Sequence, residues 1–276
     1  MKRVNLSKTV WFSVLIALLV LLASGAGLFL KGTYARETPS WAIQAMGQDI
    51  ANVVSALTLL VAVYFASKGS VGAFLVWAGV LITLLYSSVI YAFAAHFNSL
   101  FLVYVAILGL SFYTLAGAVI HLPLNHLQSF FVSRVRARLV SAFLLLVGIL
   151  FFLLWLKEDI PALLTGVVPQ SVVENGLLTN PVHVLDLGLY LPAMLLTAVF
   201  LWRGRLPGYL LALPLLVFSV LTGIGILAID LVMAMKGLPV NLGVDTFITA
   251  IVLMSLVLSV FYGKDAQKQS GKIWAE

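Results

Sequence analysis

Cysteine is absent from this chain of 276 residues, and charged residues make up only 9 % of it. Without cysteine the chain cannot form a disulfide framework, a thiolate zinc site, an iron–sulfur cluster or a cysteine nucleophile. A soluble domain carries about a quarter charged residues, whereas here 62 % of the residues are hydrophobic. The composition therefore excludes a water-soluble globule.

Sequence motifs of several enzyme classes are also missing. The chain has no phosphate-binding P-loop, no G-x-S-x-G nucleophile elbow and no H-E-x-x-H zinc motif. No lysine lies deep inside an apolar run, where a retinal-type lysine would be expected. The sequence thus assigns no reaction and no cofactor, and it leaves open whether the protein is an enzyme.

Long uncharged apolar runs dominate the chain. A bilayer core requires roughly 20 residues of helix, and these runs are continuous and Leu-rich instead of alternating, which favours helices over transmembrane strands. We expect an all-α, polytopic membrane helix bundle with eight transmembrane helices, forming a single transmembrane domain over 1–276. The predicted spans are 10–30, 50–66, 71–95, 99–120, 139–156, 182–202, 206–235 and 244–262.

The first run has a second interpretation, because it follows Lys2, Arg3 and Lys8 and contains the small residues A-S-G-A at 23–26, which are typical of a cleaved signal peptide. Its 21 uncharged residues exceed the roughly 7 to 15 residues of a signal core. We therefore expect an uncleaved span.

Basic residues predict the orientation, because cytoplasmic loops carry the excess of Lys and Arg. With the N-terminus inside, 12 of the 16 basic residues fall on the cytoplasmic side and four fall outside. We expect both termini in the cytoplasm, with a tail over 263–276. A surplus of +6 in so apolar a chain points to membrane lipids as partners and argues against nucleic acid; it says nothing of an oligomer.

The order of the loops predicts an internal duplication. Spans one and five each lead into a long outer loop, then a short basic inner turn and a shorter outer turn. Halves of 1–130 and 131–262 would form a 4+4 parallel repeat about an axis along the membrane normal, as in some transporters. Chance alternation of loops is the alternative, because the halves share little residue identity.

Acidic residues concentrate on the predicted outer side. Eight of the ten lie there, and Asp49, Asp186, Asp230 and Asp245 lie at or just inside the outer ends of spans. An ionised Asp in the hydrocarbon region costs about 2.5 to 3.5 kcal/mol. Such carboxylates are therefore expected to face the bundle interior or a water-filled cavity and to meet a partner there.

Asp186 is the deepest of these acids. The pair Asn180-Pro181 predicts a helix start, which places Asp186 about 9 Å along the axis. His183, Asp186 and Tyr190 are spaced i, i+3 and i+7 and should share one face of the helix. The group is interpreted as metal ligands, as a proton relay, or as a satisfied pair in which Asp186 orients His183.

Further polar residues are expected in the same outer layer. Together they would offer oxygen and nitrogen to a divalent cation or a proton-linked solute, with His183, Asp186 and His96 as the metal candidates; topology also permits a haem between His96 and His183. Solvated Asp and interfacial Tyr are the alternative. The additional binding candidates are Gln48, Asp49, Asn52, Tyr86, Tyr91, His96 and Asn98.

Three loops carry expectations of their own. The run T-P-S-W at 38–41 predicts a short surface helix before span two. The apolar segment 161–176 predicts either a surface helix or a segment that folds back over the mouth of the site. His121 and His126 lie in a basic cytoplasmic loop, where we expect contact with anionic lipid and not a metal site.

Three motifs carry a resemblance: G-Q-D at 47–49, F-N at 97–98 and N-P-V-H-V-L-D at 180–186, followed by Pro192. With them the chain resembles a group of uncharacterised eight-span prokaryotic integral membrane proteins. The resemblance implies this architecture and a prokaryotic plasma (inner) membrane. It implies no activity.

The outer acids predict a multi-pass membrane protein with an outward-facing polar site that binds a cation or small solute and transports or senses it. One alternative is a non-catalytic membrane subunit or scaffold whose polar layer serves helix packing. Another is an intramembrane enzyme acting on a lipid or quinone, with His183 and Asp186 as acid and base.

Overall fold

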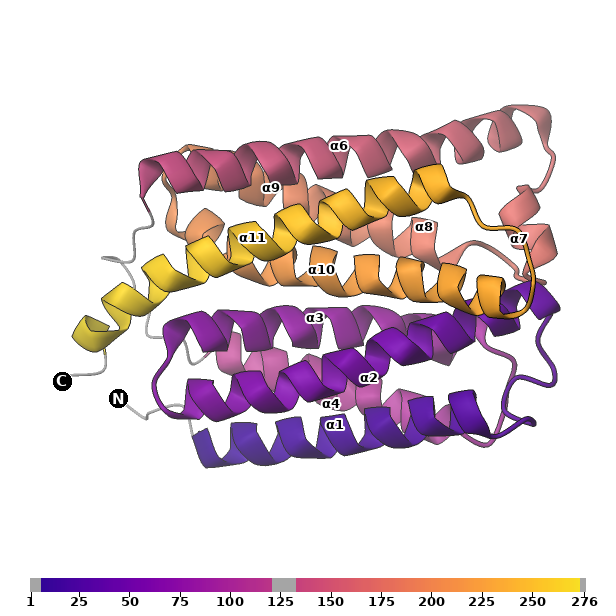
Figure 1. The fold of residues 1–276 in the computed structure, drawn as a ribbon, viewed down its shortest axis with the longest axis horizontal. Coiled ribbons are helices and arrows are strands. Elements are labelled where there is room, and N and C mark those ends of the chain that lie inside the picture. Colours follow the sequence, from indigo (N-terminus) through magenta and orange to yellow (C-terminus); the bar gives the residue numbers. More distant parts are fainter. Residues whose placement is uncertain (1–5, 121–132, 274–276) are drawn as a thin grey trace.

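The computed structural model describes the backbone of residues 6–120 and 133–273 (Figure 1). Over these ranges the secondary structure is helical, and eight helices are long and apolar enough to cross a membrane. The predicted all-α, multi-pass architecture is confirmed. His121 and His126 lie outside the described residues.

The chain folds as two groups of helices joined through α10. In the first group α1 packs against α2 and α4, and α3 packs against α2 and α4; in the second, α9 packs between α6 and α10, and α11 covers α10. Because α10 also contacts α2 and α3, it forms the seam between the groups. The elements are α1 (Leu6–Phe29), α2 (Pro39–Ser67), α3 (Val71–Ala94), α4 (Phe101–Ile120), α6 (Arg134–Thr165), α7 (Gln170–Glu174), α8 (Pro181–Leu185), the π-helical turn η1 (Asp186–Tyr190), α9 (Leu191–Trp202), α10 (Leu206–Met235) and α11 (Leu242–Ile273).

The bundle has two unlike ends. The start of α1 and the end of α11 lie together at one end, which we call the proximal end (Figure 1). The opposite, distal end carries 30–38, 95–100, 166–180 and 236–241. The distal end is the one that the sequence predicts to face outward.

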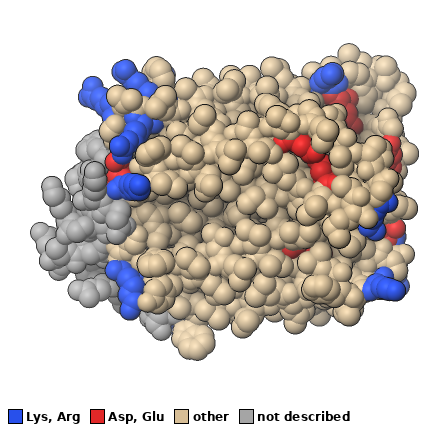
Figure 2. Space-filling view, in the orientation of Figure 1, with Lys and Arg blue, Asp and Glu red and all other residues tan. Residues whose placement is uncertain are grey.

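The surface between the two ends is apolar. Figure 2 shows charged side chains gathered at both ends, with a belt between them that is almost free of charge apart from a few acidic atoms toward the distal end. Large side chains such as Val61, Leu146 and Leu253 are exposed. A continuous apolar belt is unfavourable in water and fits the hydrocarbon core of a membrane.

Helix α2 begins well before its predicted limit of residue 50. The Thr38 side chain accepts a hydrogen bond from the Trp41 N–H at 3.2 Å, and Pro39 occupies the first helical position. The predicted surface helix at 38–41 is therefore the first turn of α2 itself. As a result, Asp49 lies ten residues inside the helix and not at its start.

Helices α6 and α11 also exceed their predicted spans. Helix α6 continues past its predicted end at 156 to Thr165, and Gly166 follows it in the left-handed conformation at φ 69°. Pro161 lies in this last part of the helix, where its missing N–H removes one helical hydrogen bond. Helix α11 runs to Ile273, so part of the predicted tail is helical. In both helices the charged residues that ended the apolar runs continue the helix.

Two glycines let α10 approach the first group closely. A Cβ atom at Gly47 would lie 2.5 Å from the backbone of Ile229, and one at Gly79 would lie 2.6 Å from the carbonyl oxygen of Pro214. Neither position has room for a side chain. Such small-residue contacts are typical of helix packing in membranes.

We expect Gly47→Ala to destabilise the protein by about 1–3 kcal/mol, because the new methyl group must push α2 from the α10 backbone. The measurement is thermal unfolding in detergent, followed by tryptophan fluorescence. Gly109→Ala on α4 is the control, since nothing lies within 4 Å of its Cβ position. Equal midpoints for the two variants would contradict the packing described.

Candidate functional site

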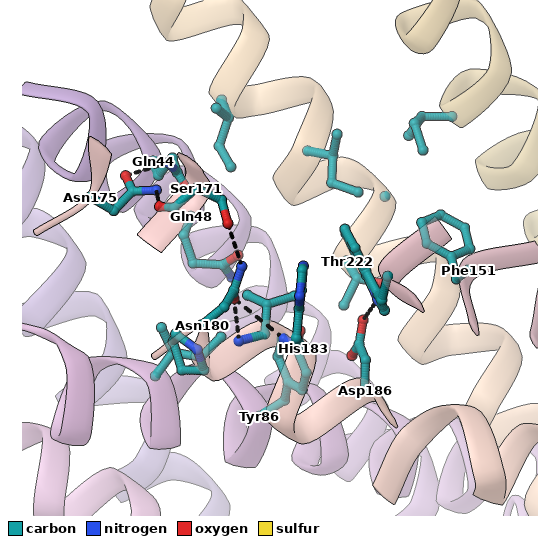
Figure 3. Close-up of a pocket in the computed structure, with 18 of the residues that line it drawn as sticks. Gln44, Gln48, Tyr86, Phe151, Ser171, Asn175, Asn180, His183, Asp186 and Thr222 are labelled. Atoms are coloured by element: carbon teal, nitrogen blue, oxygen red, sulfur yellow. Dashed lines mark hydrogen bonds between the residues drawn. The ribbon is translucent and has the colours of Figure 1, made fainter. Parts of the chain in front are cut away.

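A cavity of about 470 Å³ lies between the two helix groups, with walls from α2, α3, α6, α8, η1, α9, α10 and α11 and from the segment around α7. Much of its wall is apolar, with side chains such as Phe151, Phe218 and Ile251. Polar side chains gather on α8 and the neighbouring elements, as Figure 3 shows. This volume is within the range of about 300–1,000 Å³ that is typical of small-molecule sites.

Asn180 starts the helix that carries the site. Its Oδ1 accepts hydrogen bonds from the N–H groups of Val182 at 3.0 Å and His183 at 3.3 Å, and Pro181 follows at the first helical position. The helix start predicted from Asn180-Pro181 is confirmed. The Asn180 Nδ2 also donates to Ser171 Oγ at 3.3 Å, which ties α8 to the segment that covers the cavity.

A π-helical turn, η1, follows directly after α8 and begins at Asp186. In η1 the Leu191 N–H bonds the Asp186 carbonyl, five residues back. The next residue, Pro192, has no N–H to donate, so the ordinary helical bond to Gly188 cannot form. One extra residue in the turn rotates the side chains that follow it, and such π-turns recur at functional sites.

The sequence spacing predicts that Tyr190 shares a helix face with His183 and Asp186, but the π-turn rotates Tyr190 away from that face. His183 and Asp186 line the cavity, whereas Tyr190 is not among its described lining residues. The Tyr190 ring stacks on Phe218 at a centroid distance of 4.6 Å and meets Tyr86 edge-on at 4.9 Å. Its hydroxyl donates to the Ile82 carbonyl at 3.4 Å. Tyr190 therefore supports the wall of the cavity from behind.

His183 is paired with α6. Its Nδ1 lies 2.9 Å from Asp159 Oδ1, and its Nε2 lies 3.8 Å from Glu158 Oε2. The side chain is buried, with 5 % of the residue exposed. The carboxylate that orients the imidazole is thus Asp159, and not Asp186 as the satisfied-pair interpretation has it.

Asp186 meets a different partner on α6. Its Oδ2 accepts a hydrogen bond from Trp155 Nε1 at 2.8 Å, and the residue is 8 % exposed. The same indole packs against the His183 ring at a centroid distance of 4.4 Å. Trp155 therefore fixes both polar side chains, while Tyr86 completes the wall beside Asp186.

The segment around α7 covers part of the cavity. Ser171, Glu174 and Asn175 line it, and Asn175 Oδ1 accepts a hydrogen bond from Gln44 Nε2 of α2 at 2.8 Å (Figure 3). Of the two interpretations of 161–176, the first residues belong to α6 and the α7 part folds back over the site. The cover is held to both helix groups by side-chain amides.

The charge of the cavity wall is acidic. Glu158, Glu174 and Asp186 line it together with His183, and none of the described lining residues is Lys or Arg. In a site with apolar walls the field of unpaired carboxylates is weakly screened. The wall therefore favours a positive or neutral hydrogen-bonding group over an anion.

Asp49 does not face this cavity. It lies inside the first helix group, where its Oδ2 accepts a hydrogen bond from the Tyr34 hydroxyl at 2.6 Å and its Oδ1 lies 3.1 Å from the Tyr91 hydroxyl. Burial, together with the nearby Asp49 carboxyl, raises the pKa of Tyr34 well above its ordinary value, so the phenol stays protonated. The neighbouring Gln48 does line the cavity, and its Nε2 donates to Asn52 Oδ1 at 3.0 Å.

His96 and Asn98 belong to the distal surface. The ring Nδ1 and the backbone N–H of His96 both meet the Glu37 carboxylate, at 2.9 and 2.8 Å. Asn98 Oδ1 accepts from the Leu100 N–H at 2.9 Å just before α4. Neither lines the cavity, so the structure does not bring His96 to His183. In the ranges described, no group of three or more His, Asp or Glu is placed to hold a metal ion.

Sequence reasoning missed the α6 side of the site. The predicted span ends at 156, so it includes Trp155 without assigning it to the site and leaves Glu158 and Asp159 beyond its end. Phe151, Trp155 and Glu158 are spaced i, i+4 and i+7, which is one helix face. This spacing predicts that the three side chains share a face, but only if the helix is assumed to continue through the charged residues 157–159.

Comparison with protein-family models, with curated proteins and with solved structures finds no match for this chain. The resemblance to an eight-span prokaryotic group therefore stays a prediction, and the function has to be argued from the site.

We expect Asn180→Ala to destabilise the protein by about 1 kcal/mol, because two N–H groups at the start of α8 lose their acceptor. Thermal unfolding measures the loss. Asn180→Asp is the matched control, since its carboxylate still accepts both hydrogen bonds. The capping role is refuted if the alanine and aspartate variants unfold at the same temperature.

Proposed function

We propose that this protein binds a small amphipathic molecule from the distal side of the membrane, as the binding step of transport or sensing. The single observation that carries the proposal is the cavity between the two helix groups, which reaches Asp186 and His183. Its apolar walls suit a hydrocarbon portion, and its polar wall suits one head group.

The size and lining of the cavity support this function over two others. A scaffold whose polar residues serve packing needs no cavity of about 470 Å³ beside them. An inorganic cation alone would leave most of that volume and the apolar wall without a role. An organic solute uses both.

The head group follows from the charge of the wall. Asp186 interacts with two donors, the Trp155 indole N–H and the Tyr86 hydroxyl, and a further donor or a positive group would complete its remaining acceptor sites. Glu158 and Glu174 add to the same field. We therefore propose a ligand whose head is cationic or neutral and donates hydrogen bonds.

The proposed setting is a prokaryotic plasma membrane with the distal end outside. The support is the distribution of basic residues, since 12 of 16 fall on the side of the termini and cytoplasmic loops carry such an excess. The 4+4 parallel repeat belongs to the same proposal, because a site between related halves is typical of transporters.

A second candidate function is supported by the His183–Asp159 pair. A buried imidazole held at 2.9 Å by a carboxylate is a common arrangement for general acid–base catalysis. In an intramembrane enzyme acting on a lipid or quinone, the cavity would hold the substrate and His183 would move a proton. Turnover of a bound lipid or quinone that His183→Gln abolishes while binding persists would favour this function over transport.

The proposed ligand class predicts a ranking of simple probes. Octylammonium, octanol and octanoate share a chain and differ in head group, and their binding to protein in lipid nanodiscs can be followed by the fluorescence of Trp41 and Trp155, which line the cavity. We expect octanoate to bind about tenfold or more weakly than the ammonium probe, which corresponds to about 1.4 kcal/mol or more.

The matched variants are Asp186→Asn and Asp265→Asn. The first removes one of the three carboxylates that line the cavity and should weaken the preference for the ammonium probe. The second makes the same change at the proximal end, where Asp265 pairs with Arg136, and should preserve the preference. Equal affinity for all three probes, or a preference that Asp186→Asn leaves unchanged, would contradict the proposal.

A further inference from the structure

A second, much smaller polar void lies inside the first helix group. All four of its helices contribute to the wall, and the volume of about 20 Å³ is enough for one water-sized particle. We call this void the Asp49 cage. Its oxygen-bearing side chains are Ser24, Asp49, Asn52, Ser87, Ser88, Tyr91 and Tyr104.

The carboxylate in the cage has no balancing charge. Asp49 is 2 % exposed, and the ion pairs of the described residues do not include it. Burying an ionised carboxylate costs several kcal/mol unless an opposite charge accompanies it. A positive charge inside the cage would provide that balance.

The hydroxyl groups around the cage present acceptors to it. Ser88 donates its proton to the Leu85 carbonyl at 3.0 Å, and Ser87 donates to the Leu84 carbonyl at 3.3 Å. A hydroxyl has one proton and two lone pairs. Once these protons point to backbone carbonyls, the lone pairs of both oxygens remain for a ligand.

Tyr91 strengthens the same argument. Its hydroxyl lies 2.8 Å from the Ala45 carbonyl and 3.1 Å from Asp49 Oδ1, and it has one proton for the two acceptors. When the proton lies in the shorter hydrogen bond to Ala45, a lone pair of the Tyr91 oxygen faces a lone pair of Asp49 Oδ1. That arrangement is favourable when a cation lies beside both oxygens.

Tyr104 supplies an independent observation. It is 4 % exposed and lines the cage, and within the described part of the chain its hydroxyl makes no hydrogen bond of good geometry, although Tyr34 and Asn98 are polar neighbours. A buried hydroxyl left without a partner costs about 1–3 kcal/mol. A ligand in the cage would give this oxygen a partner.

We propose that the Asp49 cage is a binding site for a single sodium ion. Oxygen ligands from carboxylate, hydroxyl and amide groups suit a hard cation, and one carboxylate balances one positive charge, which favours a monovalent ion over a divalent one. The small volume favours Na⁺ over the larger K⁺. Gly27 makes the compact cage feasible, because a Cβ there would collide with the Asp49 carboxylate and the Tyr34 hydroxyl.

Thermal unfolding of the full chain in detergent tests the site. At one fixed alkaline pH, replacing N-methylglucamine chloride by NaCl should raise the midpoint in a saturable way, by roughly 2–5 °C, and KCl should raise it much less. Asp49→Asn should abolish the response to Na⁺. Asp186→Asn should keep it, which separates this site from the cavity and from the function proposed for the cavity.

Tyr104→Phe keeps the proposal testable if Asp49→Asn fails to fold. Loss of one oxygen ligand should raise the Na⁺ concentration at half-saturation roughly fivefold, which corresponds to about 1 kcal/mol. The proposal is overturned by equal midpoints in Na⁺ and N-methylglucamine, by a Na⁺ response that survives Asp49→Asn, or by unchanged half-saturation in Tyr104→Phe.

Discussion

A carboxylate buried inside a helix bundle needs hydrogen-bond donors around it. The polar interior of this protein is organised around two such carboxylates, Asp186 and Asp49. Asp186 is met by the Trp155 indole, and Asp49 is met by the Tyr34 phenol. Each donor comes from a different segment, so each hydrogen bond also fixes how that segment packs. Because Trp155 also packs against His183, one indole sets the geometry of the polar wall.

Helix α2 separates the two polar compartments by presenting a different side to each. Gln44 and Gln48 face the large cavity, whereas Asp49 and Asn52 face the cage. This is possible because consecutive residues of a helix point in different directions around its axis. The neighbours Gln48 and Asp49 therefore face different compartments. The Gln48–Asn52 hydrogen bond runs along the helix between the two compartments.

The spans could be predicted because an apolar run of sufficient length has few alternatives to a membrane helix. The site was predicted only in part, because charge was taken as the end of a span. Glu158 and Asp159 can continue α6 because the His183 side chain pairs with them. Asp49 can lie deep in α2 because phenol hydroxyl groups surround its carboxylate. Such partners come from other helices, and a single sequence does not show them. The π-turn that begins at Asp186 likewise depends both on Pro192 and on the packing of the neighbouring helices.

Tyr91 belongs to the walls of both compartments, and its hydroxyl bridges the α2 backbone and Asp49. A side chain shared in this way cannot shift for an occupant on one side without altering the shape available on the other. Thermodynamic linkage then requires the influence to be mutual and equal in free energy in both directions. One aromatic ring thus gives this fold the physical means for the two proposed ligands to regulate each other's affinity.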